Sequence, residues 1–220
     1  MAASNFDISR RTEETFAALA GYLAPSPQLA VISGPSGVGK DSVLRRMREL
    51  GYPFHFVVTA TDRAPRAGET EGVDYHFVTT AQFEQMIAEN ELFEYARVYE
   101  QYKGVPKRHV REALAGGSDV IMRLDVQGAA TVCRLVPGAL SIFIAPPSLE
   151  VLVERLSQRG GDTPEQLHRR ISTAIDEMAC LPDFQYVIIN RQGDLDRAVH
   201  EIVAIMTAAR CCTARQKVVV

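Results

Sequence analysis

Runs of apolar residues recur along the chain and predict its buried strands. Five such runs stand out, namely residues 29–33 (LAVIS), 54–59 (FHFVVT), 119–125 (DVIMRLD), 140–145 (LSIFIA) and 186–190 (YVIIN). Most of them are separated by segments with helical periodicity. Near-continuous apolar strands that alternate with helices are typical of a parallel sheet covered on both faces. The pattern therefore predicts an α/β fold with a parallel five-stranded sheet covered by helices.

The alternation is interrupted twice, and these interruptions predict how the chain is divided. Residues 60–108 are too long for a connection and predict an inserted subdomain. Residues 148–176 carry two arginine-bearing helical patterns around a Gly-Gly turn, which is typical of a mobile flap. The remaining predicted parts are an N-terminal extension (1–28), a core (29–59, 109–147 and 177–210) and a C-terminal tail (211–220).

Composition and charge mainly exclude classes of function. The 220 residues carry a formal net charge of −3, which gives no support to nucleic acid or a membrane as a partner. No apolar run reaches the roughly 20 residues of a membrane span, and the N-terminus lacks the apolar core of a signal peptide. The four cysteines form no C-x-x-C pair. We expect a reduced, cytoplasmic protein, with an organelle as the alternative, that is a monomer or a homodimer.

A glycine-rich stretch directly after the first strand predicts a phosphate-binding loop. Its sequence, GPSGVGKDS, is close to the pattern G-x-x-x-x-G-K-[ST]. The glycines let the backbone curl so that several N–H groups point at one phosphate chain, and the lysine supplies a positive charge. The predicted ATP-binding residues of this loop are Gly34, Pro35, Ser36, Gly37, Val38, Gly39, Lys40, Asp41 and Ser42.

Asp41 occupies the position where the pattern has a serine or threonine. In related loops that hydroxyl helps to hold Mg²⁺, and a carboxylate is also a good oxygen ligand for this ion. Asp41 is therefore a candidate metal ligand, with Mg²⁺ as the predicted cofactor. The alternative is a structural role, because a negative charge stabilises the first turn of a helix.

Five separate blocks resemble guanylate kinases, the enzymes that phosphorylate GMP with ATP. The blocks are SGPSGVGKDSV, TATDRAPRAGETEGVDYHFV, FEYARVYEQYKGVP, LDVQGA and IAPPSLEVLVERLSQRG. The similarity runs from about residue 29 to about residue 208, and variants such as GKD look more like the plant organellar branch. It implies a phosphate-loop nucleoside monophosphate kinase fold with a GMP-binding insert and a helical lid. It also implies Mg²⁺-dependent transfer of the ATP γ-phosphoryl group to GMP or dGMP in purine nucleotide metabolism.

The resemblance also implies which residues form the two substrate sites. Guanidinium groups suit a terminal phosphate, and the lid arginines of the family close over the ATP phosphates. The implied GMP-binding residues are Thr59, Arg63, Arg66, Tyr75, Glu94, Lys103 and Asp125. The implied catalytic residues are Lys40, Arg63, Arg155, Arg159 and Arg170, and Asn190 is expected near the adenine.

Glu94 is the predicted reader of the guanine base. Alternation along ELFEYARV puts this carboxylate on an otherwise apolar face with Leu92, Ala96 and Val98. A carboxylate there is costly unless it is paired. Guanine offers N1–H and N2–H₂ as adjacent donors, whereas adenine presents an acceptor. The alternative is that Glu94 pairs with a local arginine such as Arg97.

Three residues depart from the usual pattern of the family. Lys103 replaces a tyrosine that contacts the GMP phosphate, a contact that lysine can also make. Val105 replaces a hydroxyl that bonds guanine, a loss on the order of 0.5–1.5 kcal/mol, which predicts weaker affinity but retained guanine preference. Arg123 replaces an acidic residue and is predicted to pair with Asp41, so that the two unusual residues compensate each other.

Two other functions stay open at this point. Ribose bisphosphate kinases of phosphonate metabolism also carry the GKDS sequence, but Glu94 would have no base to read there. Guanylate-kinase-like binding modules of membrane scaffolds usually have damaged phosphate loops. The glycines and Lys40 are intact in this chain, and they favour an enzyme.

Overall fold

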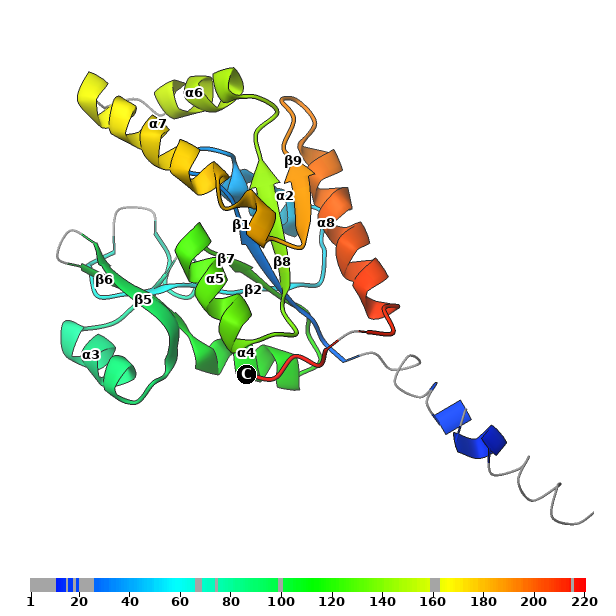
Figure 1. Cartoon of the computed structure of the whole chain (residues 1–220). Coiled ribbons are helices and arrows are strands. Elements are labelled where there is room, and N and C mark those ends of the chain that lie inside the picture. The colour runs from blue at the N-terminus through cyan, green and yellow to red at the C-terminus, as the bar shows by residue number, and fades with distance from the viewer. Residues whose placement is uncertain are drawn as a thin grey trace, which may run out of the picture.

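A parallel five-stranded sheet forms the centre of the molecule (Figure 1). The computed structural model describes residues 11–14, 16–17, 19, 26–65, 69–73, 75–98, 101–158, 163–214 and 216–220. The strands of the sheet are β1 (Leu29–Ser33), β2 (His55–Phe56), β7 (Val120–Arg123), β8 (Leu140–Ala145) and β9 (Tyr186–Ile189). They run in the order β2-β7-β1-β8-β9 with every pairing parallel. The predicted α/β fold with a parallel five-stranded sheet is confirmed.

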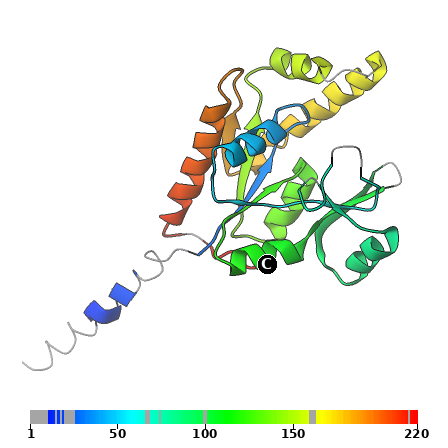
Figure 2. The same ribbon diagram turned by 180° about the vertical axis from the view of Figure 1, so that it is seen from behind.

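Helices cover both faces of this sheet. They are α2 (Lys40–Glu49), α4 (Lys107–Ala115), α5 (Val126–Leu135) and α8 (Leu195–Arg210). Side chains of β1 alternate between the two faces, so Ala30 and Ile32 pack with α2 and α8 while Leu29 and Val31 pack with α4 and α5. Figure 1 shows α5 in front of the sheet, and Figure 2 shows α2 on the opposite face. Both faces of the central strand are thus fully covered.

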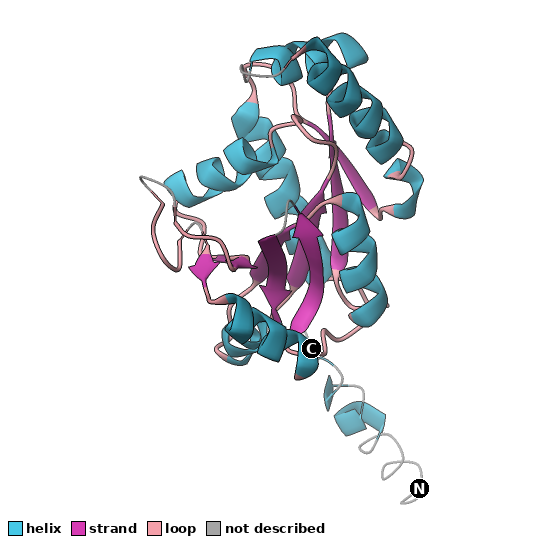
Figure 3. Cartoon of the chain, turned by 90° about the vertical axis from the view of Figure 1, so that its left-hand side faces the viewer, coloured by secondary structure: helices cyan, strands magenta, loops and turns pink. Residues whose placement is uncertain are grey.

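A second sheet stands beside the first and has the order β4-β3-β6-β5. Its elements are β3 (Ala60–Thr61), β4 (His76–Phe77), α3 (Thr80–Ala88), β5 (Leu92–Val98) and β6 (Gln101–Pro106). Ala60, Phe83 and Leu92 form a small core of their own that holds α3 against the sheet. Figure 3 presents this side of the molecule to the viewer. The predicted insert at 60–108 spans these elements, and the domain division itself stays a prediction.

Two helices extend from the end of β8, near the loop that follows β1 (Figure 1). These are α6 (Leu149–Gln158) and α7 (Pro164–Met178), and the short 3₁₀ helix η1 (Leu181–Asp183) follows. Thr163 and Gln166 form a reciprocal capping box at the start of α7. The predicted lid, 148–176, covers α6 and most of α7. Over the described residues, no helix has both the length and the apolar character needed to cross a membrane.

The strand predicted over residues 54–59 is much shorter in the structure, where β2 covers only His55–Phe56. As the edge strand, β2 pairs with β7 alone. Val57 still donates a backbone hydrogen bond to the main sheet. Two residues later, the carbonyl of Thr59 accepts a bond from His76 of the insert, at 2.9 Å. The apolar run therefore crosses from one sheet to the other, a change that hydrophobicity alone does not reveal.

The alternation predicted along the strand of Glu94 is wrong at its start. The pairing of β5 with β6 shifts register between Leu92 and Tyr95, and such a bulge places two residues opposite one. Leu92 packs in the small core of the insert, whereas Phe93 packs with Val105 in the main core. Glu94 and Ala96 line the same cavity, as the alternation predicts, whereas Leu92 packs in the core of the insert and is not part of that lining.

Asp119 connects three segments of the core and carries a stability prediction. It is 7% exposed, accepts the Gln28 backbone N–H at 2.9 Å and pairs with Arg210 of α8. Replacing Asp119 by Ala leaves a buried donor unsatisfied, so the free energy of unfolding should fall by about 1–3 kcal/mol. Urea unfolding measures this loss. As a control, Glu49→Ala removes only exposed pairs with Arg45 and Arg46 and should cost less than about 1 kcal/mol; equal losses in both variants would contradict the prediction.

Candidate active site

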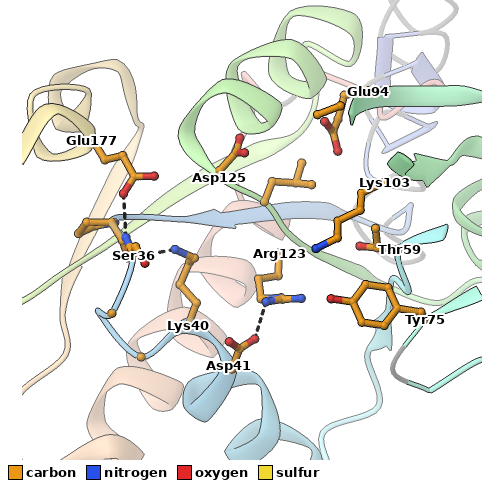
Figure 4. A pocket seen from close by; sticks show the side chains of 15 residues that line it. Ser36, Lys40, Asp41, Thr59, Tyr75, Glu94, Lys103, Arg123, Asp125 and Glu177 are labelled. Atoms are coloured by element: carbon orange, nitrogen blue, oxygen red, sulfur yellow. Dashed lines mark hydrogen bonds and ion pairs between the residues drawn. The ribbon is translucent and has the colours of Figure 1, made fainter. Parts of the chain in front are cut away.

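A cavity of about 360 Å³ opens where β1 and β7 end, between the glycine-rich loop and the insert (Figure 4). Ligands of parallel α/β sheets bind at this edge, and small-molecule sites typically measure about 300–1,000 Å³. The lining residues are Pro35, Ser36, Gly37, Gly39, Lys40, Asp41, Thr59, Tyr75, Glu94, Ala96, Lys103, Arg123, Leu124, Asp125 and Glu177. The cavity thus brings together most residues predicted for the ATP phosphates and for GMP.

The path of the glycine-rich loop requires glycine at two of its positions. Gly34 has a φ of 136°, and a side chain there would collide with the carbonyl oxygen of Ile144. Gly39 has a φ of 98° and precedes α2, and a Cβ atom there would lie 2.6 Å from the side-chain nitrogen of Asn190. The loop therefore curls tightly between β1 and α2, as its sequence predicts.

The groups of the loop that suit an anion already contact protein oxygens. Lys40 donates from Nζ to the carbonyl oxygens of Gly34 and Pro35. Burial lowers the pKa of Lys40, and the negative charge of Glu177 is the largest opposing influence. Glu177 of α7 accepts the Ser36 backbone N–H through Oε2, at 2.8 Å. A carboxylate oxygen thus occupies a donor that a phosphate oxygen would use.

Glu177 is a site residue that the sequence analysis missed. It lies 141 positions from Ser36 along the chain. It reaches the loop only because α7 folds back across the end of the sheet. No local motif marks this residue, so only the tertiary structure identifies it.

Two carboxylates converge at the start of α5. Asp125 caps this helix, because its Oδ1 accepts the Gly128 N–H at 2.7 Å. A Cβ atom at Gly128 would lie 3.3 Å from both the Glu94 carboxyl carbon and Asp125 Oδ1, so the two acids lie close together. Burial, and then the charge of Asp125, raises the pKa of Glu94 to about 7. The alternative ion pair of Glu94 with Arg97 is absent from the described part of the chain.

Thr59, Tyr75 and Lys103 line the side of the cavity that belongs to the insert. Lys103 places its Nζ 5.9 Å from the centre of the Tyr75 ring. Figure 4 shows these side chains facing Arg123 across the cavity. A cation, a phenol and a hydroxyl in this arrangement suit an anionic group that approaches the loop from the insert.

Arg123 forms an ion pair with Asp41, with Nη1 and Oδ1 2.6 Å apart. This contact confirms the predicted pairing of the two unusual residues. Arg123 ends β7 and Asp41 lies in the first turn of α2. The pair therefore spans the floor of the cavity between the loop and the insert (Figure 4).

Arg63 was predicted to bind the GMP phosphate, and it does not line the cavity. Its guanidinium donates to both oxygens of Glu69, at 2.5 and 2.6 Å, and lies 4.8 Å from the centre of the Tyr75 ring. Arg63 is thus next to the cavity but is engaged by an acid of the insert. Arg66 and Arg159 lie outside the described residues.

Two residues predicted for the ATP side contact the loop at the Val38 carbonyl, outside the cavity. The Asn190 side chain is buried and donates to the Val38 carbonyl at 2.8 Å. Arg155 of α6 donates to the carbonyls of Val38 and Asn190, at 3.1 and 3.0 Å. Neither side chain lines the cavity, and neither do those of Arg170 or Ser42. Their roles toward ATP stay predictions.

Val105 has a structural position that the sequence did not suggest. It is 1% exposed and packs in the main core with Phe93 and Val110, away from the cavity lining. The register shift in β5 leaves two residues, Phe93 and Glu94, opposite Val105. Its apolar side chain therefore contributes to packing at the junction of insert and core.

Asp41 is the residue considered for a metal. Within the described part of the chain, no group of three His, Cys, Asp or Glu side chains is placed to hold a metal ion. Mg²⁺ in phosphate-transfer sites keeps several waters and binds through one or two carboxylates and the substrate phosphates. Asp41 has a side chain 62% exposed at the cavity wall, with Oδ1 paired to Arg123. An accessible carboxylate beside a phosphate loop fits such a partly hydrated ion.

Comparisons with known proteins identify the family. A family model described as guanylate kinase matches residues 26–209. The chain belongs to the guanylate kinase family. A chloroplastic/mitochondrial guanylate kinase 2 from Oryza sativa is 46% identical over 187 residues, which cover 84% of this chain and 66% of the rice protein, just under two thirds of its length. A guanylate kinase from Gloeobacter violaceus is 47% identical over 76% of this chain and 81% of its own.

A solved structure supports the same assignment at the level of the fold. The crystal structure of guanylate kinase from Anaplasma phagocytophilum has a TM-score of 0.66 and 29% sequence identity, and it covers 87% of this chain and 90% of its own. The resemblance to guanylate kinases, their phosphate-loop kinase fold and the kinase class are thereby confirmed. The plant organellar relative and the bacterial relative have nearly equal sequence identity to this chain, 46% and 47%.

The raised pKa of Glu94 predicts how GMP binding depends on pH. Only the charged carboxylate accepts both guanine donors, so the dissociation constant of GMP should fall as pH rises through about 7 and then level off. Glu94→Gln should weaken GMP binding by about tenfold or more, because a hydrogen bond to a charged group is worth about 1.5–3 kcal/mol. Calorimetric titration between pH 5.5 and 8.5 measures both effects.

The same titration of Glu94→Gln is the control for the phosphate of GMP. A phosphate monoester titrates near pH 6 and keeps this step in the variant. A step near pH 7 that persists in Glu94→Gln would contradict the assignment to Glu94.

The contact between Glu177 and the loop predicts the effect of neutralising this side chain. Glu177→Gln weakens a charge-assisted bond by about 1 kcal/mol and removes a negative charge near the phosphates. The dissociation constant of ADP should therefore fall by about fivefold, measured by calorimetry. Asp176→Asn, one position earlier and exposed on α7, should leave it unchanged. Unchanged or weaker ADP binding in Glu177→Gln would contradict this prediction.

Proposed function

We propose that this chain transfers the γ-phosphoryl group of ATP to GMP and gives ADP and GDP. The observation that carries the proposal is the single cavity in which Lys40 and the loop face Glu94 and Asp125. One wall offers N–H donors and a cation for a phosphate chain, and the other offers paired acceptors for a purine edge. Membership of the guanylate kinase family supports the same reaction.

On the ATP side, the loop N–H groups and Lys40 hold the outer phosphates, aided by the N-terminus of α2. For this to happen, Glu177 gives up the Ser36 N–H to a phosphate oxygen. Asn190 keeps the loop in shape through Val38. Arg155, Arg159 and Arg170 are the proposed lid arginines, which turn toward the phosphates as α6 and α7 close. In this movement Arg155 gives up its contact with the Val38 carbonyl.

On the GMP side, Glu94 and Asp125 accept the guanine donors. Lys103, Tyr75 and Thr59 hold the phosphate on the side of the insert. Arg63 joins them by exchanging the carboxylate of Glu69 for the GMP phosphate, because its guanidinium already lies against Tyr75. Arg66 is proposed to make the corresponding contact from the same loop. GMP and dGMP are the proposed acceptors.

The reaction requires positioning and charge stabilisation more than acid–base chemistry. The phosphate of GMP loses its second proton near pH 6, so its attacking oxygen needs no base at neutral pH. Enclosure of the site excludes water, which would otherwise compete for the phosphoryl group. The histidines of the insert and core, which do not line the cavity, take no part in this scheme.

Mg²⁺ is the proposed cofactor, with Asp41 as its protein ligand, directly or through water. When bound, the ion neutralises charge on the transferring phosphates. Asp41 can serve in this way because its side chain is exposed at the cavity wall and its Oδ1 is held by the ion pair with Arg123. A cytoplasmic location and a monomeric or homodimeric state stay predictions.

Steady-state kinetics with the four nucleoside monophosphates test the proposed function. GMP should be preferred over AMP by at least about 30-fold in kcat/KM, because each of the two acids left facing a wrong base costs about 1–3 kcal/mol. Ribose 1,5-bisphosphate, added as a fifth acceptor, tests the sugar-phosphate alternative. Equal turnover of AMP or UMP, a preference for the sugar phosphate, or no turnover at all would overturn the proposal.

A further inference from the structure

Arg123 occupies a position in the cavity that the proposed roles leave unused. It is the last residue of β7 and lies beside Ile32 in the sheet register, just before the glycine-rich loop. Its side chain is 37% exposed and lines the cavity between Lys40 on one side and Tyr75 and Lys103 on the other (Figure 4). The boundary between the ATP and GMP regions therefore contains a fixed cation.

The ion pair with Asp41 orients the Arg123 guanidinium but uses only some of its N–H donors. Nη1 lies 2.6 Å from Asp41 Oδ1, and over the described residues Asp41 is its sole ion-pair partner. A guanidinium has five N–H donors in a rigid fork. The remaining donors are available on the cavity side. Lys40 and Arg123 line the same cavity, so both cations face an anion that binds there.

We propose that Arg123 is a catalytic residue that contacts the phosphoryl group during its transfer, and that Asp41 is the positioning residue that holds its guanidinium in place. This inference rests on the proposed function. In this proposal, Arg123 supplies positive charge between the donor and the acceptor nucleotide. Lys40 lies on the ATP side of this position and Lys103 on the GMP side. Asp41 then has a role toward a neighbouring side chain as well as toward a metal.

The step itself balances without a proton. An oxygen of the GMP phosphate forms a new bond to the γ-phosphorus, and the bond from that phosphorus to the β–γ bridging oxygen breaks. The electron pair of the broken bond stays on the β-phosphate of ADP. Negative charge on the transferring group is spread over its three outer oxygens. Arg123 donates to one of these oxygens, and its contact is strongest while the group is between the two nucleotides.

The first test is the kinetics of Arg123 and Asp41 variants, after wild-type turnover of GMP has been established. R123A should lower kcat by about 100-fold or more, the range seen when one preorganised donor to a developing charge is removed, and KM for GMP should change little. R123K should recover part of the loss. D41N should lower kcat by about tenfold, because a misplaced group loses part of its effect. The combined loss in the double variant should be smaller than the product of the two single losses, because part of the effect of Asp41 is exerted through Arg123.

A matched ion pair on the same helix provides the control. Arg46 of α2 pairs with Asp196 of α8 at 2.6 Å, has a side chain 33% exposed and lies outside the cavity. R46A should keep kcat within about twofold of wild type, as expected for a surface pair. Thermal unfolding of R123A, R123K and R46A checks the fold, and R123Q replaces R123A if the latter is unfolded.

A binding measurement separates catalysis from structure. A guanosine and an adenosine joined by five phosphates carry a phosphate where the transferring group passes. R123A should weaken binding of this compound by about 100-fold in calorimetry, as expected for a contact realised only between donor and acceptor, and binding of ADP or GMP alone by less than about threefold.

Three results would overturn the proposal: R123A with kcat within about threefold of wild type, equal weakening of all three ligands, or additive losses in the double variant. A wild-type chain that fails to phosphorylate GMP would instead overturn the proposed function. The two failures are distinguishable because wild-type turnover is measured first.

Discussion

The parallel pairing of β1 with β7 is the constraint on which the rest of the site depends. Ile32 lies beside Arg123 in this register, so the chain leaves both strands at the same level of the sheet. The glycine-rich loop follows β1, and the start of α5, capped by Asp125, follows β7. Every residue of β1 is buried, so a slip of one residue would turn its apolar side chains to the wrong helices. The packing of the core therefore fixes the distance between phosphate donors and base-reading acids.

A further feature of the site is that Lys40, Arg123 and Arg63 each contact protein oxygens before any substrate arrives. Lys40 contacts loop carbonyls near Glu177, Arg123 pairs with Asp41, and Arg63 pairs with Glu69. Burial disfavours the charged form of a lysine, so these partners keep the cations charged and ordered. Phosphate binding at these cations would then replace contacts with protein oxygens, which are carboxylates at Arg123 and Arg63 and carbonyls at Lys40. Such an exchange limits the net gain in affinity for the phosphate. It would also release Glu177 of α7 and Glu69 of the insert from their contacts when nucleotides bind.

Much of this arrangement follows from local sequence, and the parts that do not have physical reasons. The strands at 29–33 and 140–145 have the predicted bounds, because both are buried on two faces and read as unbroken apolar runs. The glycine-rich loop was predictable because its conformation requires particular residues. The bulge at Phe93 and Glu94 was not, because a register shift depends on the partner strand.

Contacts between distant segments were the least predictable part of the site. Glu177 was missed because no local pattern indicates that an acid 141 positions from Ser36 reaches the loop. Glu69 lies only six positions from Arg63, and this pair was missed because the sequence does not specify which nearby acid pairs with which cation. The pairing of Arg123 with Asp41 was predicted because each residue departs from the family pattern in a way that the other balances. Charge complementarity between two unusual residues is therefore a stronger signal than either residue alone.

The charge balance between Asp41 and Arg123 explains why a carboxylate is tolerated beside a phosphate loop. An unpaired carboxylate 4 Å from a phosphate oxygen would be repelled by about 4 kcal/mol at an intermediate effective dielectric. The ion pair with Arg123 cancels most of that field on the cavity side, since the guanidinium lies between Asp41 and the insert (Figure 4). Relative to the usual hydroxyl and acid of the family, the Asp41–Arg123 pair is more positive by one charge. The exchange therefore makes the centre of the cavity more favourable to the charge that accumulates there during transfer, and each of the two residues is tolerated because the other is present.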